Sequence, residues 1–212
     1  RAGRSDSPDR RADPRGLTDN SVTRAEPRRA SVGYPGGLRA RWAWGGSGQG
    51  ADVFALSESG GDIIDHGTLG GPDVEQYCRA EVRVEGPAGT WTARFASPIY
   101  DEPAALLWDT PALFVATYGF TTYAFDARGG SLRWHHRSGT PLIALIGSSR
   151  LAHVIVQAEI ETFAIEADGT VAWRVAHSDV VTSAELVGGK LVLNSFSAQV
   201  TALDPVTGRT AG

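Results

Sequence analysis

The sequence predicts an all-β fold, a partial β-propeller of about three to four four-stranded antiparallel blades. A pattern of strand, acidic turn with glycine, and strand recurs: residues 123–134 read YAFDARGGSLRW, 163–173 read FAIEADGTVAW and 201–210 read TALDPVTGRT. The copies start 38 to 40 residues apart. Each period holds four short apolar or alternating segments and needs no helix. Four strands per period of about 40 residues are typical of a propeller blade.

The three copies keep the same residue types at the same places. Alanine recurs at 124, 164 and 202, the acid at Asp126, Glu166 and Asp204, and the turn glycine at 129, 169 and 208. Gly89 opens a weaker copy, GTWTARF, and residues 54–66 repeat the turn out of period. The regular repeat is therefore expected over residues 89–212.

The strands of each period follow from runs of apolar residues between turn residues. One unit is expected at 131–137, 142–146, 151–157 and 161–166, and the next at 170–175, 181–187, 190–194 and 199–204. Asp168–Gly169 and Gly188–Gly189 are typical of hairpin turns, because glycine adopts positive φ without a Cβ clash.

These copies resemble the repeat of the PQQ-like (quinoprotein-like) β-propeller family, in which a strand leads into V/L-Y-A-L-D, a T-G turn and a later Trp. Residues 191–208, LVLNSFSAQVTALDPVTG, are the closest copy. The chain departs from the motif where the family has a Gly before its Y-A-L-D strand, and the last copy stops before its Trp. The resemblance identifies a propeller repeat and leaves the activity open.

The Trp and the acid of each copy have structural roles available. Trp134 and Trp173 are expected to pack between neighbouring blades, where an indole N–H can reach a turn carbonyl. Asp126, Glu166 and Asp204 are expected to cap the turns that follow them. Repetition of both residue types in successive copies favours architecture over a ligand site.

Charge and composition divide the chain into three segments. Residues 1–41 hold ten arginines and five acids, with prolines and few large apolar residues. We expect residues 1–40 to be a disordered Arg/Pro-rich tail or linker, since such a segment buries too little surface to offset its ordering entropy. Residues 41–88 are expected to form an irregular β segment or degenerate blade, and 89–212 three propeller repeats.

The sequence predicts no catalytic, cofactor-binding or metal-binding residue. His135 and His136 point to opposite faces of a strand, and a site joining His136 to His153 or His66 lacks recognisable ligand spacing. GSGQGA at 46–51 resembles a dinucleotide loop, but a strand rather than a helix is expected after it. Cys78 is the only cysteine, so no intrachain disulfide forms, whereas quinone-dependent dehydrogenases of the related superfamily use an adjacent Cys–Cys pair.

We therefore expect a non-catalytic propeller segment that acts as a scaffold for protein–protein interaction, similar to propeller lipoproteins that help to assemble bacterial outer-membrane barrels. The alternative is a sensor or substrate-binding domain of a larger enzyme whose catalytic part lies outside this chain. No apolar run is long enough for a transmembrane helix, and specific nucleic-acid binding is not expected.

Too few blades are present to close a ring of the usual size. The partner is therefore expected to be another protein, the remainder of a longer propeller or a second copy of the chain at an open blade edge, unless residues 42–84 cap the opening. The family resemblance implies a periplasmic or extracytoplasmic location.

Overall fold

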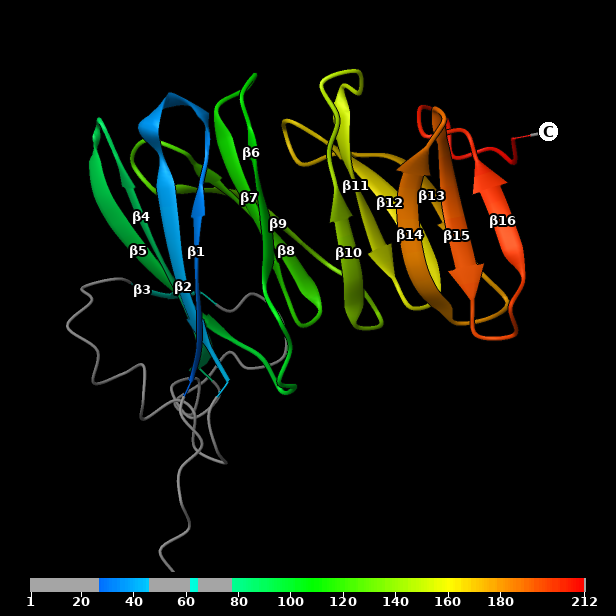
Figure 1. The fold of residues 1–212 in the computed structure, drawn as a ribbon, viewed down its shortest axis with the longest axis horizontal. Coiled ribbons are helices and arrows are strands. Elements are labelled where there is room, and N and C mark those ends of the chain that lie inside the picture. The colour runs from blue at the N-terminus through cyan, green and yellow to red at the C-terminus, as the bar shows by residue number, and fades with distance from the viewer. Residues whose placement is uncertain (1–26, 46–61, 65–77, 212) are drawn as a thin grey trace, which may run out of the picture.

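Four β-sheets stand in a row in chain order in the computed structural model, which describes residues 27–45, 62–64 and 78–211 (Figure 1). The predicted all-β propeller architecture is confirmed. Among the residues described, no helix is long and apolar enough to cross a membrane.

The first sheet has the strand order β1-β2-β4-β5-β3. A short 3-10 turn, Pro35–Gly37, joins β1 to β2, and β3 pairs with β5 in parallel while the other pairs are antiparallel. Its strands are β1 (Arg28–Gly33), β2 (Arg39–Trp44), β3 (Asp62–Ile64), β4 (Cys78–Gly86) and β5 (Gly89–Ala96).

In the other three sheets, every strand pairs antiparallel with its neighbours in sequence. The second sheet is β6 (Ala104–Trp108), β7 (Leu113–Tyr118), β8 (Thr121–Asp126) and β9 (Leu132–Arg137). The third is β10 (Leu142–Ile146), β11 (His153–Ala158), β12 (Glu161–Glu166) and β13 (Val171–Ala176). The fourth is β14 (Val181–Val187), β15 (Lys190–Ser195) and β16 (Val200–Leu203).

Three apolar cores lie between the four sheets, one at each interface between neighbours. Strands β7 and β11 are buried at every residue, because both faces of the second and third sheets contact another sheet. This explains why their sequences, LFVATY and HVIVQA, lack the alternation of a strand with one solvent face. Strand β10 lies beside both β6 and β14, so the first strands of successive sheets approach one another.

The strands fall close to their predicted positions, but the predicted grouping of strands into units is wrong by one strand. Residues 132–137 close the second sheet instead of opening the third, and 171–176 close the third instead of opening the fourth. The acidic turn explains the difference. It is a hairpin that joins β8 to β9 and β12 to β13, and the two arms of a hairpin pair within one sheet.

The predicted disordered tail is wrong for residues 28–40, and its remainder lies outside the described residues. Strands β1 and β2 form there because RARWAW at 39–44 alternates, with Ala40, Trp42 and Trp44 buried and the arginines outside. Strand β2 also crosses the expected boundary at residue 41 and pairs with β4. The first sheet is thus a blade-like sheet rather than an irregular segment.

Tryptophan joins each sheet to the next, as the repeat predicts, and packs there against a glycine, which in the first copy is Gly130 rather than the repeat's turn glycine Gly129. The Trp134 indole Nε1 donates to the carbonyl oxygen of Ala167 at 2.9 Å, and Trp91 in the weaker copy donates to Ala127 at 3.3 Å. A Cβ added to Gly130, Gly169 or Gly208 would come within 2.8 Å of a Trp side chain of the preceding sheet, and all three glycines have positive φ. We call this arrangement the Trp–Gly joint.

An acidic residue caps each of the three turns by accepting backbone amides, but in the middle copy this residue is Asp168 instead of the predicted Glu166. The Asp126 carboxylate accepts the Arg128 and Gly129 amides at 3.0 and 2.9 Å, and these bonds, that of Gly129 above all, hold its pKa below the usual value. Asp204 likewise accepts the amides of residues 206 and 207. In the middle copy Asp168, two residues after Glu166, accepts the Thr170 amide at 2.9 Å.

Candidate functional site

The histidines singled out in the sequence lie apart in the structure. His135 is exposed on β9, whereas His136 on the other face packs on the Phe163 ring with centroids 4.7 Å apart. His153 is buried on β11, and its Nε2 lies 2.8 Å from the carbonyl oxygen of Pro205. His66 and the GSGQGA segment fall outside the described residues. Within the part of the chain that the structure describes, no three His, Cys, Asp or Glu side chains converge on a metal position.

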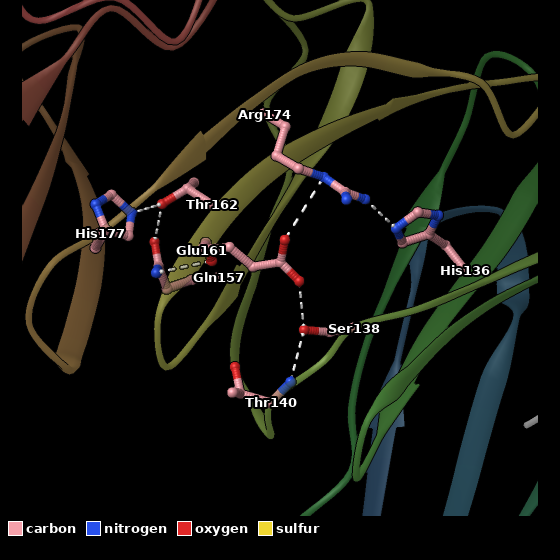
Figure 2. Close-up of polar contacts among 8 residues, drawn as sticks. All are labelled: His136, Ser138, Thr140, Gln157, Glu161, Thr162, Arg174 and His177. Atoms are coloured by element: carbon pink, nitrogen blue, oxygen red, sulfur yellow. Dashed lines mark hydrogen bonds and ion pairs between the residues drawn. The ribbon is translucent and has the colours of Figure 1, made fainter. Parts of the chain in front are cut away.

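A polar cluster joins the second sheet to the third at the end of the sheets where their connecting links lie (Figure 2). Glu161 begins β12, and its carboxylate accepts the Ser138 hydroxyl at 2.7 Å and lies 3.5 Å from Arg174 Nε. Arg174 Nη2 lies 2.8 Å from His136 Nε2. Because a guanidinium only donates, His136 Nε2 is the acceptor and the ring is neutral.

The cluster contains the residue types of a hydrolytic triad, but its hydrogen bonds are arranged differently. In a triad the nucleophile donates to histidine, which donates to the acid. Here Ser138 donates to Glu161, and His136 accepts from Arg174. Ser138 Oγ also accepts the Thr140 amide at 3.2 Å, which fixes the link between β9 and β10. The arrangement therefore holds two sheets and a link together.

A second polar branch of this cluster joins the third sheet to the link that follows it (Figure 2). Thr162 Oγ1 donates to Gln157 Oε1 at 2.5 Å and lies 2.6 Å from His177 Nε2. Gln157 Nε2 donates to the carbonyl oxygens of Ala158 and Glu161. Gln157 and Thr162 are fully buried, so these bonds satisfy polar groups that would otherwise destabilise the fold.

Burial lowers the pKa of both histidines in the cluster. For His136 desolvation is the main cause and the Arg174 charge adds to it, while Glu161 opposes them. For His177 the cause is desolvation. Both effects favour the neutral ring, which agrees with the acceptor role of His136.

An apolar patch lies at the same end of the third and fourth sheets, the lower end in Figure 1. We define the rim patch as Ile160, Val180 and Phe196, which are 44%, 39% and 81% exposed. The Phe196 amide donates to the Val180 carbonyl at 2.7 Å, and the His177 amide donates to the Ile160 carbonyl at 2.8 Å. These bonds hold the β11–β12 turn, the following link and the β15–β16 turn together.

Asp179 fixes the loop that presents Phe196. Its carboxylate accepts the hydroxyl and the amide of Ser197 at 2.5 and 3.0 Å. These bonds, with others from Ser195 and Val180, lower the pKa of Asp179 to about 2. The rim patch is thus exposed and locally fixed.

A groove of about 700 Å³ opens between the second and third sheets at their opposite end. Apolar side chains from β6, β10 and the β10–β11 turn, among them Leu106, Trp108, Leu145 and Leu151, line about half of it, and polar atoms line the rest. Asp109 and Ser149 add polar atoms. The groove and the rim patch are therefore separate surfaces.

The sequence did not reveal either the polar cluster or the rim patch. His136, Ser138, Glu161 and Arg174 meet only because two sheets pack together. Phe196 could have been noticed, because the β15–β16 turn is one residue longer than its counterparts and carries an aromatic residue.

A protein-family comparison matches residues 88–211 to the model described as outer membrane protein assembly factor BamB. The chain belongs to this BamB family. The match covers the repeats identified from the sequence, and the PQQ-like propeller resemblance is confirmed. The search of curated proteins gave no match.

Several solved structures are similar to this BamB-family chain at low identity. BamB from Moraxella catarrhalis is 20% identical with a TM-score of 0.47, over 62% of this chain and 41% of that one. The HIRA(644-1017) structure is 10% identical with a TM-score of 0.48, over 88% and 52%. Dihydro-heme d1 dehydrogenase NirN is 13% identical with a TM-score of 0.49, over 62% and 32%. The chain thus spans at most about half the length of these structures.

Proposed function

We propose that the chain is a non-catalytic propeller scaffold that binds another protein through the rim patch. The family name describes an assembly factor, and proteins that assemble others act by binding them. By that likeness, the partner is a component of a protein assembly.

The exposed Phe196 carries this proposal. Exposed apolar patches often mark interaction sites, and aromatic residues often dominate the binding energy of interfaces. Phe196 is 81% exposed, and Asp179 and Val180 hold the turn that bears it. A turn with a fixed backbone loses little conformational entropy when a partner covers it.

The proposal is tested by comparing Phe196→Ser with Val206→Ser. Val206 is another exposed apolar residue, 59% exposed, in the turn after β16 at the opposite end of the sheets. Partners captured from extracts of the source organism are identified by mass spectrometry, purified and titrated by calorimetry. Phe196→Ser should weaken binding at least about tenfold, while Val206→Ser leaves it unchanged. A purified partner that binds both variants equally would refute the role of the patch.

The groove between the second and third sheets favours a second candidate, a sensor or substrate-binding domain of a larger enzyme whose catalytic part lies outside this chain. Grooves in which polar groups stand among apolar side chains are typical places for small-molecule sites. Leu145→Trp would fill the groove with a larger side chain. A compound that raises the melting temperature of the unchanged chain but not of this variant would support the second candidate over the first.

A further inference from the structure

The outward face of the first sheet is the face that points away from the second sheet. It differs in composition from the corresponding faces of the second and third sheets, each of which packs on the preceding sheet. In the second and third sheets, this face holds apolar residues such as Phe114, Tyr123, Val156 and Phe163. In the first sheet, alternation places Ala40, Trp42, Val82 and Val84 inward, toward the second sheet. Charged side chains therefore occupy its outward face, which is the end of the row on the left of Figure 1.

Arginine dominates this outward face. Cross-strand register places five arginines and two glutamates there: Arg29, Arg39, Arg41, Arg83, Arg94, Glu81 and Glu85. Glu81 and Arg94 are direct cross-strand neighbours, and neither is without a partner. The other four arginines share this face with one further glutamate, Glu85, which is the direct cross-strand neighbour of Arg39.

Glu85 is shared between two guanidinium groups. Its carboxylate lies 3.3 Å from Arg41 Nη2 and 3.3 Å from Arg83 Nε. Arg41 and Arg83 are themselves direct cross-strand neighbours, and like charges in that position destabilise a sheet. Both side chains are more than half exposed, at 56% and 54%, so further carboxylates can reach them.

From this surplus of exposed guanidinium groups we infer that the outward face of the first sheet binds an acidic, extended segment of a partner protein. Arg39 and Arg41 lie two residues apart on β2, about 6.6 to 6.8 Å along the strand. Alternate side chains of an extended acidic peptide have the same spacing, so successive carboxylates can face successive arginines. The Glu85 contacts show that carboxylates fit between these guanidinium groups.

Other polyanions fit the described part of this face less well. On β1, β2, β4 and β5, its outward uncharged positions are small or polar, as at Ser31, Ala43, Thr90 and Thr92. Ile63 of the edge strand β3 is in register with Arg94. Single-stranded nucleic acid is usually held by stacking on aromatic side chains, and membrane surfaces by inserted apolar ones. The outward residues of β1, β2, β4 and β5 offer neither. The face is also separate from the rim patch, so each surface can be tested without the other.

The test measures binding of a fluorescein-labelled peptide of alternating Glu and Ser to the full chain by fluorescence anisotropy. A Gln–Ser peptide, an oligothymidylate and vesicles containing phosphatidylglycerol serve as competing probes. The Glu–Ser peptide should bind best, and added salt should weaken its binding. Preference for the oligonucleotide or the vesicles would overturn the inference, as would equal binding of the Gln–Ser peptide.

Three sets of substitutions locate the binding. Arg41→Glu with Arg83→Glu should weaken peptide binding about tenfold or more, and the corresponding double substitution to Gln should weaken it less. Glu85→Gln should strengthen binding, because it removes the competing carboxylate. Arg150→Glu, an exposed charge reversal on the β10–β11 turn, is the matched control. Melting curves confirm that each variant is folded.

Opposite effects at Arg41/Arg83 and at Glu85 distinguish recognition from loss of structure, since breaking the same ion pairs would destabilise the sheet in all variants. Equal binding by the unchanged chain and the double Glu variant would refute the inference. Absence of peptide binding by the unchanged chain would refute it too. Neither result affects the Phe196 experiment.

Discussion

Two Trp–Gly joints, one between the second and third sheets and one between the third and fourth, differ in the side chain that donates to the equivalent turn carbonyl. In the first case Trp134 Nε1 donates to Ala167, the residue after the acid of the turn. The equivalent residue in the next turn is Pro205, but its carbonyl is bound by His153. Trp173 still packs on Gly208, but its Nε1 is buried and meets no acceptor among the described residues. The repeat thus preserves the acceptor and the glycine contact while the donor changes.

His153 compensates for the missing indole bond. A carbonyl only accepts, so Nε2 of His153 carries a hydrogen. The imidazole also packs edge-on against Trp173, with ring centroids 5.9 Å apart. In the second sheet the same position is Leu113, beside a joint in which the Trp makes the bond itself. A polar residue, His153, thus replaces leucine at the position where the turn carbonyl receives no indole hydrogen bond.

Substitution of the two tryptophans sharpens this comparison and should have the largest effect. Trp134→Ala should lower the free energy of unfolding by about 3 to 5 kcal/mol, because it removes a buried ring and leaves a cavity. Trp173→Ala should cost about 1 kcal/mol less, since no indole hydrogen bond is lost and the ring is only partly buried. Urea unfolding of each variant measures the difference, and a larger cost for Trp173→Ala would contradict the comparison.

His153→Leu tests the donor directly. Leucine reproduces the Leu113 side chain of the second sheet but leaves the Pro205 carbonyl without its donor. An unsatisfied buried acceptor costs about 1 to 3 kcal/mol, which urea unfolding resolves. An unchanged free energy of unfolding would mean that Trp173 takes over the carbonyl and that His153 is dispensable.

The smallest expected effect is on the pH dependence of the free energy of unfolding. The pKa of His136 is lower in the folded chain than its usual value of 6.5. Below about pH 6.5 the unfolded chain therefore binds more protons, and the free energy of unfolding falls as the pH decreases. His136→Gln keeps an acceptor for Arg174 but does not titrate, so it should reduce this pH dependence. His177 should supply the remaining part, because its pKa is also lowered.

The pH effect is measured by urea unfolding between about pH 7.5 and pH 5, with His135→Gln as the control on the exposed face of the same strand. An identical pH profile for the unchanged chain and His136→Gln would contradict the role assigned to His136.

The strands of the repeat were predictable because each is marked locally, by an apolar run with turn residues on both sides. The ranges 142–146, 161–166 and 181–187 were predicted with their observed bounds, since turn residues flank each apolar run. The division into sheets was missed although the sequence held the information. Asp168–Gly169 marks a hairpin, and a hairpin cannot join two sheets of this kind.

The contacts of the candidate site could not be predicted because they join residues distant in sequence. Arg174 meets His136 across 38 positions, and His153 meets the Pro205 carbonyl across 52. The arginines at 28–41 were misassigned for a related reason. Their number is typical of a disordered tail, although RARWAW at 39–44 alternates as a strand does, and pairing with β4 makes Arg39 and Arg41 its outer positions.

The pairing of β2 with β4 also has a consequence for the order of folding. In the second to fourth sheets every pair is formed by strands adjacent in sequence, so each sheet can form from a local hairpin and extend along the row. In the first sheet, pairing Trp44 with Ala80 must close a long loop. Loop-closure entropy grows with the logarithm of length and adds about 2 kcal/mol relative to a four-residue turn. We therefore expect the first sheet, with its outward arginines, to assemble more slowly than the other three sheets.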